Sequence, residues 1–277
     1  MPPATAHKYI NKLQGHRVLV LGASTGVGFC VAEAALEHGA HVVVSSSNQT
    51  KLDKAVARLQ AHAQAIGASS DGVTGKTCDL SQPDTIENNI IQLLEFATKG
   101  GKLDHVVFTA GDAISITALK DATVESIRKT GMVREVGSIM LAKHLPKYIS
   151  VNVRSSFTVT GGTNTWRPGP DWAIIAGSGG AVEGLTRGFA VGLAPVRVNC
   201  VQLGAVHTEL FSDIPKERLP AVLESLRKEG ITGTVGRPDE VAEAYIYCMK
   251  DTFATGGVVE TNGGRLVGDG KDGLVFS

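Results

Sequence analysis

The amino-acid sequence predicts an α/β domain built on an open, doubly wound parallel sheet of about seven strands. Apolar runs of strand length alternate with segments of helical period along the chain. The 277 residues contain no internal repeat and no interdomain linker, and an open α/β domain ordinarily reaches this length. We therefore expect a single domain over residues 1–277, with residues 1–8 and 265–277 loosely ordered.

The first half of the chain is expected to supply four strands and three helices. Each strand is a short run rich in branched apolar residues, and each helix carries apolar residues three to four positions apart. The expected strands are residues 17–21, 41–45, 75–79 and 105–109, and the expected helices are residues 26–37, 51–65 and 83–98.

The second half continues the alternation of strands and helices. The expected elements are a long helical stretch at 124–144, a strand at 156–160, a helix at 181–193, a strand at 196–201, an irregular and partly helical cap at 211–226, a helix at 240–250 and a final strand at 257–260.

Composition excludes several classes of partner and site. The 27 basic and 27 acidic residues give no net charge and no basic run, so we expect no nucleic-acid partner. The longest apolar stretches have only strand length, so we expect no membrane span. The N-terminus lacks the pattern of a secretory signal. Cys30, Cys78, Cys200 and Cys248 are widely spaced, which predicts free buried thiols, no metal site and a cytoplasmic protein.

The first expected strand runs into a glycine-rich turn with the spacing G-x-x-x-G-x-G, which opens the first expected helix. Such a turn needs positive φ, which glycine adopts most easily. A diphosphate can also approach the backbone N–H groups and the positive end of the helix dipole without meeting a Cβ. We therefore expect a dinucleotide in a Rossmann-type fold; a purely structural glycine turn is the alternative. The expected cofactor-binding residues are Gly22, Ser24, Thr25, Gly26, Val27 and Gly28.

The end of the second expected strand indicates which dinucleotide binds. A site for NADH usually ends this strand with Asp or Glu, whose carboxylate binds the adenosine ribose hydroxyls. Here the strand ends in Ser45-Ser46-Ser47-Asn48, which contains no acid. Hydroxyl groups and a helix N-terminus can hold a 2′-phosphate that a carboxylate would repel. We therefore expect NADPH, bound by Ser46, Ser47 and Asn48, although these residues are also good helix caps and both roles can hold together.

Further landmarks follow in order. They are Cys78-Asp79-Leu80, Thr109-Ala110-Gly111, Ala194-Pro195-Val196-Arg197-Val198-Asn199, Leu203-Gly204-Ala205-Val206-His207-Thr208 and Asn262-Gly263-Gly264. As a set they resemble the motifs of the short-chain dehydrogenase/reductase superfamily over about residues 15–264. The resemblance implies that Asp79 contacts adenine, that Thr208 holds the nicotinamide amide and that the chain forms a homo-oligomer, a dimer or a tetramer. It adds Asp79, Leu80, Ala110, Gly111, Gly204, Val206 and Thr208 to the expected cofactor site.

The residues with which that superfamily moves protons are missing. The superfamily uses Asn, Ser and a Tyr-x-x-x-Lys pair, in which the lysine lowers the tyrosine pKa and the tyrosine exchanges a proton with the substrate oxygen. In this sequence the four positions fall on Arg134, Gly161, Ile175 and Gly179. The missing side chains exclude an ordinary ketone or alcohol mechanism through that set.

A Pro-rich loop, residues 165–172, lies between the serine and tyrosine positions and offers other side chains. We expect it above the C-terminal edge of the sheet, near the nicotinamide end of the cofactor. Reduction of an iminium cation gives a neutral amine and needs no proton, and an anion and aromatic faces nearby stabilise the cation. We therefore expect Asp171, Arg134 and Trp172 to be the catalytic residues. A surface loop with incidental charges is the alternative.

The glycine turn, the strand end at Asn48, the missing proton-transfer residues and the Pro-rich loop together resemble a narrower group, the fungal bifunctional reductases and Diels–Alderases of indole-alkaloid biosynthesis. Those enzymes build bridged bicyclic diazaoctane cores with NADPH. The resemblance implies that Asp171 is the essential acid, that Arg134 orients it or the substrate, and that Trp172 packs on an apolar polycyclic indole alkaloid precursor. In that group the aspartate precedes the tryptophan by three positions, whereas here that position is Gly169 and Asp171 adjoins Trp172.

Two other functions stay open from the sequence. The chain could be a plain NADP(H)-dependent reductase of carbonyl or imine groups with a non-standard acid, or a nucleotide-binding relative without catalysis. An intramolecular cycloaddition needs a folded substrate conformer more than an acid or base, so a shaped apolar cleft would suffice for it. Among weaker candidates, we expect His144 and His207 to be structural, and Asp112 could contact the substrate.

Overall fold

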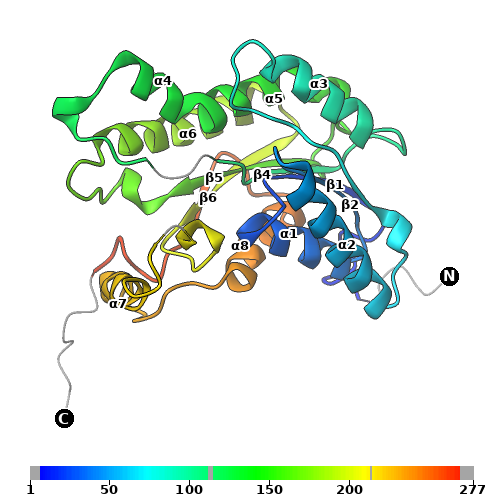
Figure 1. Ribbon diagram of the computed structural model, residues 1–277. Coiled ribbons are helices and arrows are strands. Elements are labelled where there is room, and N and C mark those ends of the chain that lie inside the picture. The colour runs from blue at the N-terminus through cyan, green and yellow to red at the C-terminus, as the bar shows by residue number, and fades with distance from the viewer. Residues whose placement is uncertain (1–6, 112–114, 213, 269–277) are drawn as a thin grey trace.

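The structure is a computed structural model that describes residues 7–111, 115–212 and 214–268. Its sheet has seven parallel strands in the order β3-β2-β1-β4-β5-β6-β7 (Figure 1). The strands are β1 (Arg17–Leu21), β2 (His41–Ser45), β3 (Val73–Gly75), β4 (His105–Phe108), β5 (Ser156–Gly162), β6 (Arg197–Leu203) and β7 (Val258–Thr261). The order reverses at the β1–β4 pair, which confirms the predicted doubly wound, Rossmann-type fold.

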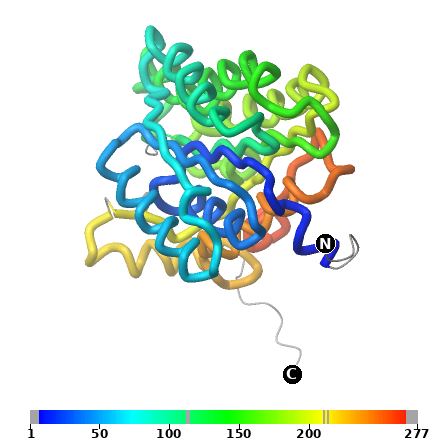
Figure 2. The backbone as a smooth tube through the Cα atoms, turned by 90° about the vertical axis from the view of Figure 1, so that its right-hand side faces the viewer, coloured from blue at the N-terminus to red at the C-terminus, as the bar shows by residue number. Residues whose placement is uncertain are grey.

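Helices cover both faces of this sheet (Figures 1 and 2). On one face lie α1 (Gly26–Glu37), α2 (Gln49–Ala65) and α8 (Pro238–Lys250), and on the other lie α3 (Ile86–Ala97), α4 (Val124–Gly131), α5 (Ser138–His144) and α6 (Ala173–Gly192). Alternate residues of one strand feed the two cores, since Val18 and Val20 join the first and Leu19 and Leu21 the second. A further helix, α7 (Leu219–Glu229), lies beside the C-terminal edge of the sheet (Figure 1).

The long helical stretch expected at 124–144 is not one α-helix. A π-helical segment, Met132–Gly137, separates α4 from α5. Such widened turns are rare and occur most often at functional sites. The expected catalytic residue Arg134 lies in this segment, so the irregular part of the helix contains a residue that the sequence predicts to be catalytic.

Other expected boundaries were wrong for identifiable reasons. The third strand is Val73–Gly75 rather than 75–79. Beyond Gly75 the chain still lies beside the end of β2, with backbone hydrogen bonds from Lys76 N to Val44 O (3.1 Å) and from Cys78 N to Ser46 O (3.0 Å), but it no longer forms a strand. Residues 181–193 were expected to lie in a helix, and all but Leu193 belong to α6. The helix starts eight residues earlier, where glycines with poor helix propensity hid it. The expected cap at 211–226 resolves into a short 3₁₀ turn and α7.

The chain ends differ in how far the structure describes them. Residues 1–6 and 269–277, which were expected to be loosely ordered, lie outside the described residues. Residues 265–268 were expected to be loose as well, yet Arg265 donates to Glu229 (2.5 Å) and to Thr163 (3.0 Å). Arg265 therefore joins this segment to α7 and to the 3₁₀ turn that follows β5.

All four cysteines are free, as predicted, and three of them are buried. Burial raises the pKa of the thiols of Cys78, Cys200 and Cys248 to about 12. Cys30 is only partly buried, which corrects the expectation for that residue. Over the described parts of the chain, no helix combines the length and apolarity needed to cross a membrane.

Candidate functional site

The glycine turn after β1 fills a space that admits no side chain. Gly22 has φ +84°, and a Cβ there would lie 2.5 Å from the backbone N of Ala110. A Cβ on Gly28 would lie 2.3 Å from the Thr109 Oγ1 and 2.5 Å from the Gly22 O. Real Cβ atoms do not come so close, so the turn, α1 and the end of β4 can pack this tightly only with glycine at both positions.

The N-terminus of α1 is left open for an anion. Thr25 is the N-cap residue, and its side chain makes no capping hydrogen bond to the first turn. The first turn contains no acidic residue, and it begins at Gly26, which has φ +59°. The first N–H groups of the helix and the positive end of its dipole therefore lie at a turn whose three glycines have no Cβ, which fits the diphosphate of a dinucleotide.

The end of β2 carries the polar residues that the sequence indicated. Ser46 Oγ donates to Ser24 Oγ (3.1 Å), so the strand end is joined to the glycine turn. Asn48 Oδ1 accepts from Lys51 N (2.9 Å) and caps α2, which confirms the capping role left open for this residue. Ser47 is exposed beside them. The side chains available to a 2′-phosphate here are hydroxyls and an amide.

The segment after β3 lies against this strand end. Asp79 Oδ1 accepts from Ser81 N (2.9 Å), and Asn89 Nδ2 donates to the Asp79 carbonyl (2.9 Å). Leu80 is buried. The Cys78–Ser46 backbone bond brings Asp79 and Leu80 next to the expected ribose site, so two segments that are far apart in the chain form one wall.

The guanidinium group of Arg134 lies near the end of β4. The Thr109 hydroxyl donates to Leu21 O (2.7 Å) and holds β4 against β1. At Gly111 a Cβ would lie 2.4 Å from Arg134 Nη2, so the guanidinium of the π-helical segment rests on this glycine. The structure therefore places Arg134 against Gly111, just after the end of β4. Asp112 lies outside the described residues.

The loop after β6 reaches across to the glycine turn. Gly204 N donates to Thr261 O (3.0 Å), and a Cβ on Gly204 would lie 2.7 Å from the Asn262 Cα. Val206 is buried. The Thr208 methyl group lies 3.2 Å from the Cβ position of Gly26, so the expected nicotinamide end and diphosphate end of the site meet here.

The position of the missing lysine is filled by another side chain. A Cβ on Gly179 would lie 2.0 Å from Thr165 Oγ1, and the Thr165 Cβ is 3.1 Å from the same point. The 3₁₀ turn Thr163–Thr165 thus crosses α6 where a lysine would stand. Gly161, at the serine position, packs against Cys200 Sγ, which lies 3.0 Å from its Cβ position.

Tyr245, which lies beside the end of β5, does not take over at this point. Tyr245 is fully buried, and its hydroxyl bonds to Thr160 Oγ1 (2.7 Å), which in turn donates to Phe108 O (2.8 Å). Burial raises the pKa of the Tyr245 hydroxyl, so this group is a poor proton donor or acceptor for a substrate.

The Pro-rich loop ends in a tight turn just before α6. Trp172 N donates to Gly169 O (3.3 Å), Pro170 is the second residue, and Asp171 is the third with φ +65°. This is the arrangement of a type II turn, which normally has glycine at the third position. The Trp172 ring folds onto Gly169, with its Cδ1 3.2 Å from the Cβ position. Asp171 is exposed at the tip of this turn.

Sequence reasoning missed the residues that hold this loop. Trp166 Nε1 donates to the buried Glu183 of α6 (2.7 Å), and Gln202 of β6 donates to the same oxygen (2.8 Å). Arg167 donates to the carbonyl of Arg265 (2.7 Å). The only sequence signal was an acid on the apolar face of α6. Its partners lie 17 and 19 residues away, where no local pattern reveals them.

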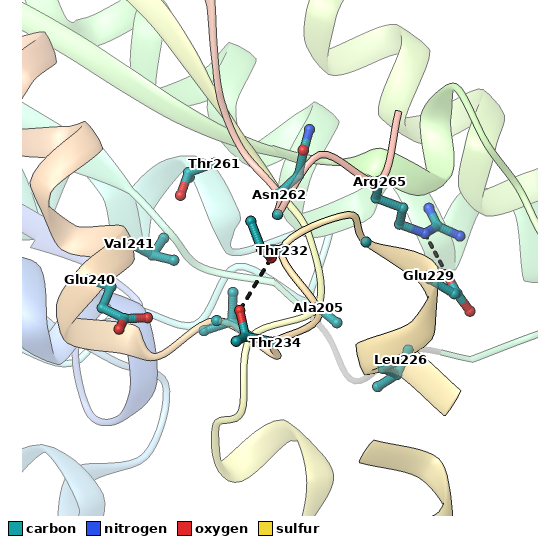
Figure 3. Close-up of a pocket in the computed structure, with 14 residues that line it drawn as sticks. Ala205, Leu226, Glu229, Thr232, Thr234, Glu240, Val241, Thr261, Asn262 and Arg265 are labelled. Carbon is teal, nitrogen blue, oxygen red and sulfur yellow. Dashed lines mark hydrogen bonds and ion pairs between the residues drawn. The ribbon is translucent and has the colours of Figure 1, made fainter. Parts of the chain in front are cut away.

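A cavity of about 170 Å³ lies between the end of α7 and the ends of β6 and β7 (Figure 3). The ion pair between Arg265 and Glu229 stands at one side of it. Of the expected site residues only Val206 lines it. Its size is below that of typical ligand pockets of roughly 300–1,000 Å³, and the residues gathered at the C-terminal ends of β1 and β4 stay the better candidate site.

The two histidines expected to be structural have contacts of that kind. His144 Nε2 pairs with Glu87 Oε1 (2.7 Å) and so joins α5 to α3. The His207 ring packs edge-on against Phe211, with ring centres 6.0 Å apart.

Comparisons with known proteins agree with this geometry. The pattern of the SDR-like Rossmann domain matches residues 9–267. The chain is 41% identical over 255 residues to the short-chain dehydrogenase/reductase malC of Malbranchea aurantiaca, covering 92% of this chain and 96% of that protein. The solved MalC reductase/Diels-Alderase superposes with a TM-score of 0.88, over 93% of this chain and 99% of that one. A short-chain dehydrogenase/reductase of Gibberella fujikuroi is 42% identical over 266 residues, covering 95% of this chain and 99% of that protein.

Proposed function

The chain belongs to the short-chain dehydrogenase/reductase family, and from that membership we propose that it is an NADPH-dependent reductase of an iminium intermediate that also guides a stereoselective intramolecular Diels–Alder cycloaddition. The proposal places it in the biosynthesis of fungal indole alkaloids, with an apolar polycyclic indole precursor as the substrate. The name reductase/Diels-Alderase of the similar protein from Malbranchea aurantiaca supports it.

One observation carries the reductive half of the proposal: the place of the proton-transfer pair is filled. Thr165 occupies the space at Gly179, and Ile175 is apolar. Reduction of a ketone creates an alkoxide that such a site cannot protonate, whereas reduction of an iminium cation creates a neutral amine. The same fold therefore favours a substrate that already carries positive charge.

The cofactor-binding residues support NADPH in this role. Gly22, Gly26 and Gly28 form the cradle for the diphosphate at the N-terminus of α1. Ser46 and Ser47 would hold the 2′-phosphate, because no carboxylate ends β2 to repel it. When bound, the reduced nicotinamide supplies a hydride to the substrate.

Three side chains are proposed to act on the substrate. Arg134, on the floor of the crevice at Gly111, orients Asp171 or an electronegative group of the substrate. Asp171 stabilises the cation from the tip of the Pro-rich loop. The Trp172 ring packs on the polycyclic substrate and helps to fold it for cycloaddition, which lowers the entropic part of the barrier.

We further propose that the protein acts as a homo-oligomer in the cytoplasm. Members of the superfamily that the sequence resembles commonly form dimers or tetramers. Free thiols are typical of a reducing compartment.

The function is tested with an iminium precursor, in the presence and absence of the protein and NADPH. The expected result is NADPH-dependent formation of reduced product and a cycloadduct isomer ratio that differs from the uncatalysed one. An isomer ratio that the protein leaves unchanged would end the cycloaddition part. Turnover of simple ketones at a comparable rate would favour a plain carbonyl reductase, and no turnover of either substrate would favour a nucleotide-binding protein without catalysis.

A further inference from the structure

Glu183 is a buried acid in α6 for which the proposed reaction has no use. Only 5% of its surface is exposed, and it lies on the face of α6 that packs on the sheet. In the described part of the chain, both of its hydrogen-bond donors are neutral and no cation pairs with it. A buried carboxylate without a cation is costly, and an apolar side chain of similar size would fill the space more cheaply. Its presence calls for an explanation beyond packing.

The two donors come from the two sides of the proposed substrate site. Trp166 belongs to the Pro-rich loop, five residues before Asp171 in the strained turn. Gln202 lies in β6, opposite Gly161 in the register and two residues before Gly204, where the loop to the nicotinamide site begins. One carboxylate oxygen thus joins the loop that carries the proposed catalytic residues to the strand that leads into the cofactor loop.

Two short hydrogen bonds to one oxygen give this junction its strength. The bonds from Trp166 Nε1 and Gln202 Nε2 to Glu183 Oε1 are 2.7 and 2.8 Å long, at the short end of the range for N–H···O hydrogen bonds. The indole of Trp166 is otherwise exposed, with 67% of the residue accessible, so packing alone does not hold it. Thr165, whose side chain fills the place at Gly179, directly precedes Trp166 in the loop.

We propose that Glu183 is a positioning residue: by accepting from Trp166 and Gln202 it fixes the Pro-rich loop over the cofactor site and so sets the place of Asp171 and Trp172. The inference rests on the proposed function only where it takes this loop for a wall of the substrate site. The position of the loop itself is measured independently of any reaction.

The chain offers a probe, because its only two tryptophans are Trp166 and Trp172 and both lie in this loop. Indole emission overlaps the absorption of NADPH, so energy transfer to bound NADPH reports how close the loop lies to the nicotinamide. Trp166→Phe keeps an aromatic ring, removes the donor to Glu183 and leaves Trp172 as the single emitter. The difference in emission between the wild-type protein and Trp172→Phe gives the part of the energy transfer that comes from Trp172 in the otherwise intact protein.

The test compares Glu183→Leu, Glu183→Gln and Trp166→Phe, with the exposed Glu95→Gln as a matched control. We expect Glu183→Leu and Trp166→Phe to lose energy transfer from Trp172 and to expose it to acrylamide, while Glu183→Gln, which keeps an acceptor, retains most of both signals. The isomer ratio of the product should shift toward the uncatalysed ratio in the same two variants, with NADPH affinity kept.

Wild-type energy transfer and quenching in Glu183→Leu would overturn the inference. If that variant does not fold, the same wild-type signals in Trp166→Phe would overturn it, since this change is at an exposed ring. Loss of the wild-type fluorescence signals in both variants supports the inference, whatever the reaction assay gives. If the wild-type protein itself forms no product, the proposed function fails, and the fluorescence result is not affected.

Discussion

Replacing Asp171 with glycine should stabilise the fold and slow the reaction at the same time. Asp171 holds φ +65° at the third position of a type II turn. A left-handed conformation costs an L-residue roughly 1–2 kcal/mol, while glycine adds about 0.5–1 kcal/mol of chain entropy to the unfolded state. The difference predicts a rise of about 0.5–1 kcal/mol in the free energy of unfolding for Asp171→Gly.

The effect on the reaction follows from the charge. A carboxylate 4 Å from a cation gains about 1 kcal/mol in water and about 4 kcal/mol at an effective dielectric constant of 20. Asp171 is exposed, so we take a value near the lower limit, about 1–2 kcal/mol, which is roughly a ten-fold loss of turnover. Asp171→Asn should lose as much turnover without the gain in stability, because Asn keeps a Cβ at positive φ and carries no charge.

Denaturant unfolding and single-turnover rates with the iminium substrate check both halves. The control is Asp84→Gly, at an exposed position whose φ is not positive, which should destabilise. Full turnover in both Asp171 variants would refute the idea that this carboxylate stabilises a cation. Destabilisation by Asp171→Gly would refute the strain argument.

Three further predictions concern the crevice, the filled lysine position and the sheet. Gly28→Ala should weaken NADPH binding at least about ten-fold and lower stability by about 1–3 kcal/mol, since its Cβ would lie 2.5 Å from a backbone oxygen; unchanged titrations would contradict this. Restoring the pair with Ile175→Tyr and Gly179→Lys should not produce ketone reduction unless Thr165, now 2.0 Å from the new Cβ, is also shortened. Burial holds the pKa of His105 well below its ordinary value. Below about pH 6.5 only the unfolded chain therefore takes up this proton, and the free energy of unfolding falls by up to about 1.4 kcal/mol per pH unit. The denaturant midpoint of His105→Asn should lack this fall with pH, and an equal fall in the variant would contradict the prediction.

The sequence predicted the parts of this protein that short-range geometry dictates. The glycine spacing from Gly22 to Gly28 could be interpreted because any strand-to-helix turn that accepts a diphosphate must avoid Cβ atoms. The loss of Tyr and Lys at 175 and 179 was equally visible, because an absent side chain cannot act in any conformation. The alternation of strands and helices followed from periodicity alone.

Other features depend on contacts between distant residues. That Thr165 fills the place at Gly179, and that Glu183 accepts from both a loop and a strand, follows from how α6 lies on the end of β5 and on β6. The π-helical segment that carries Arg134 and the positive φ of Asp171 likewise have no signature in residue spacing. Local backbone preferences fix turns and periods within a few residues, whereas the placement of a side chain in a site depends on the packing of the whole sheet and its helices, and only the folded structure decides it.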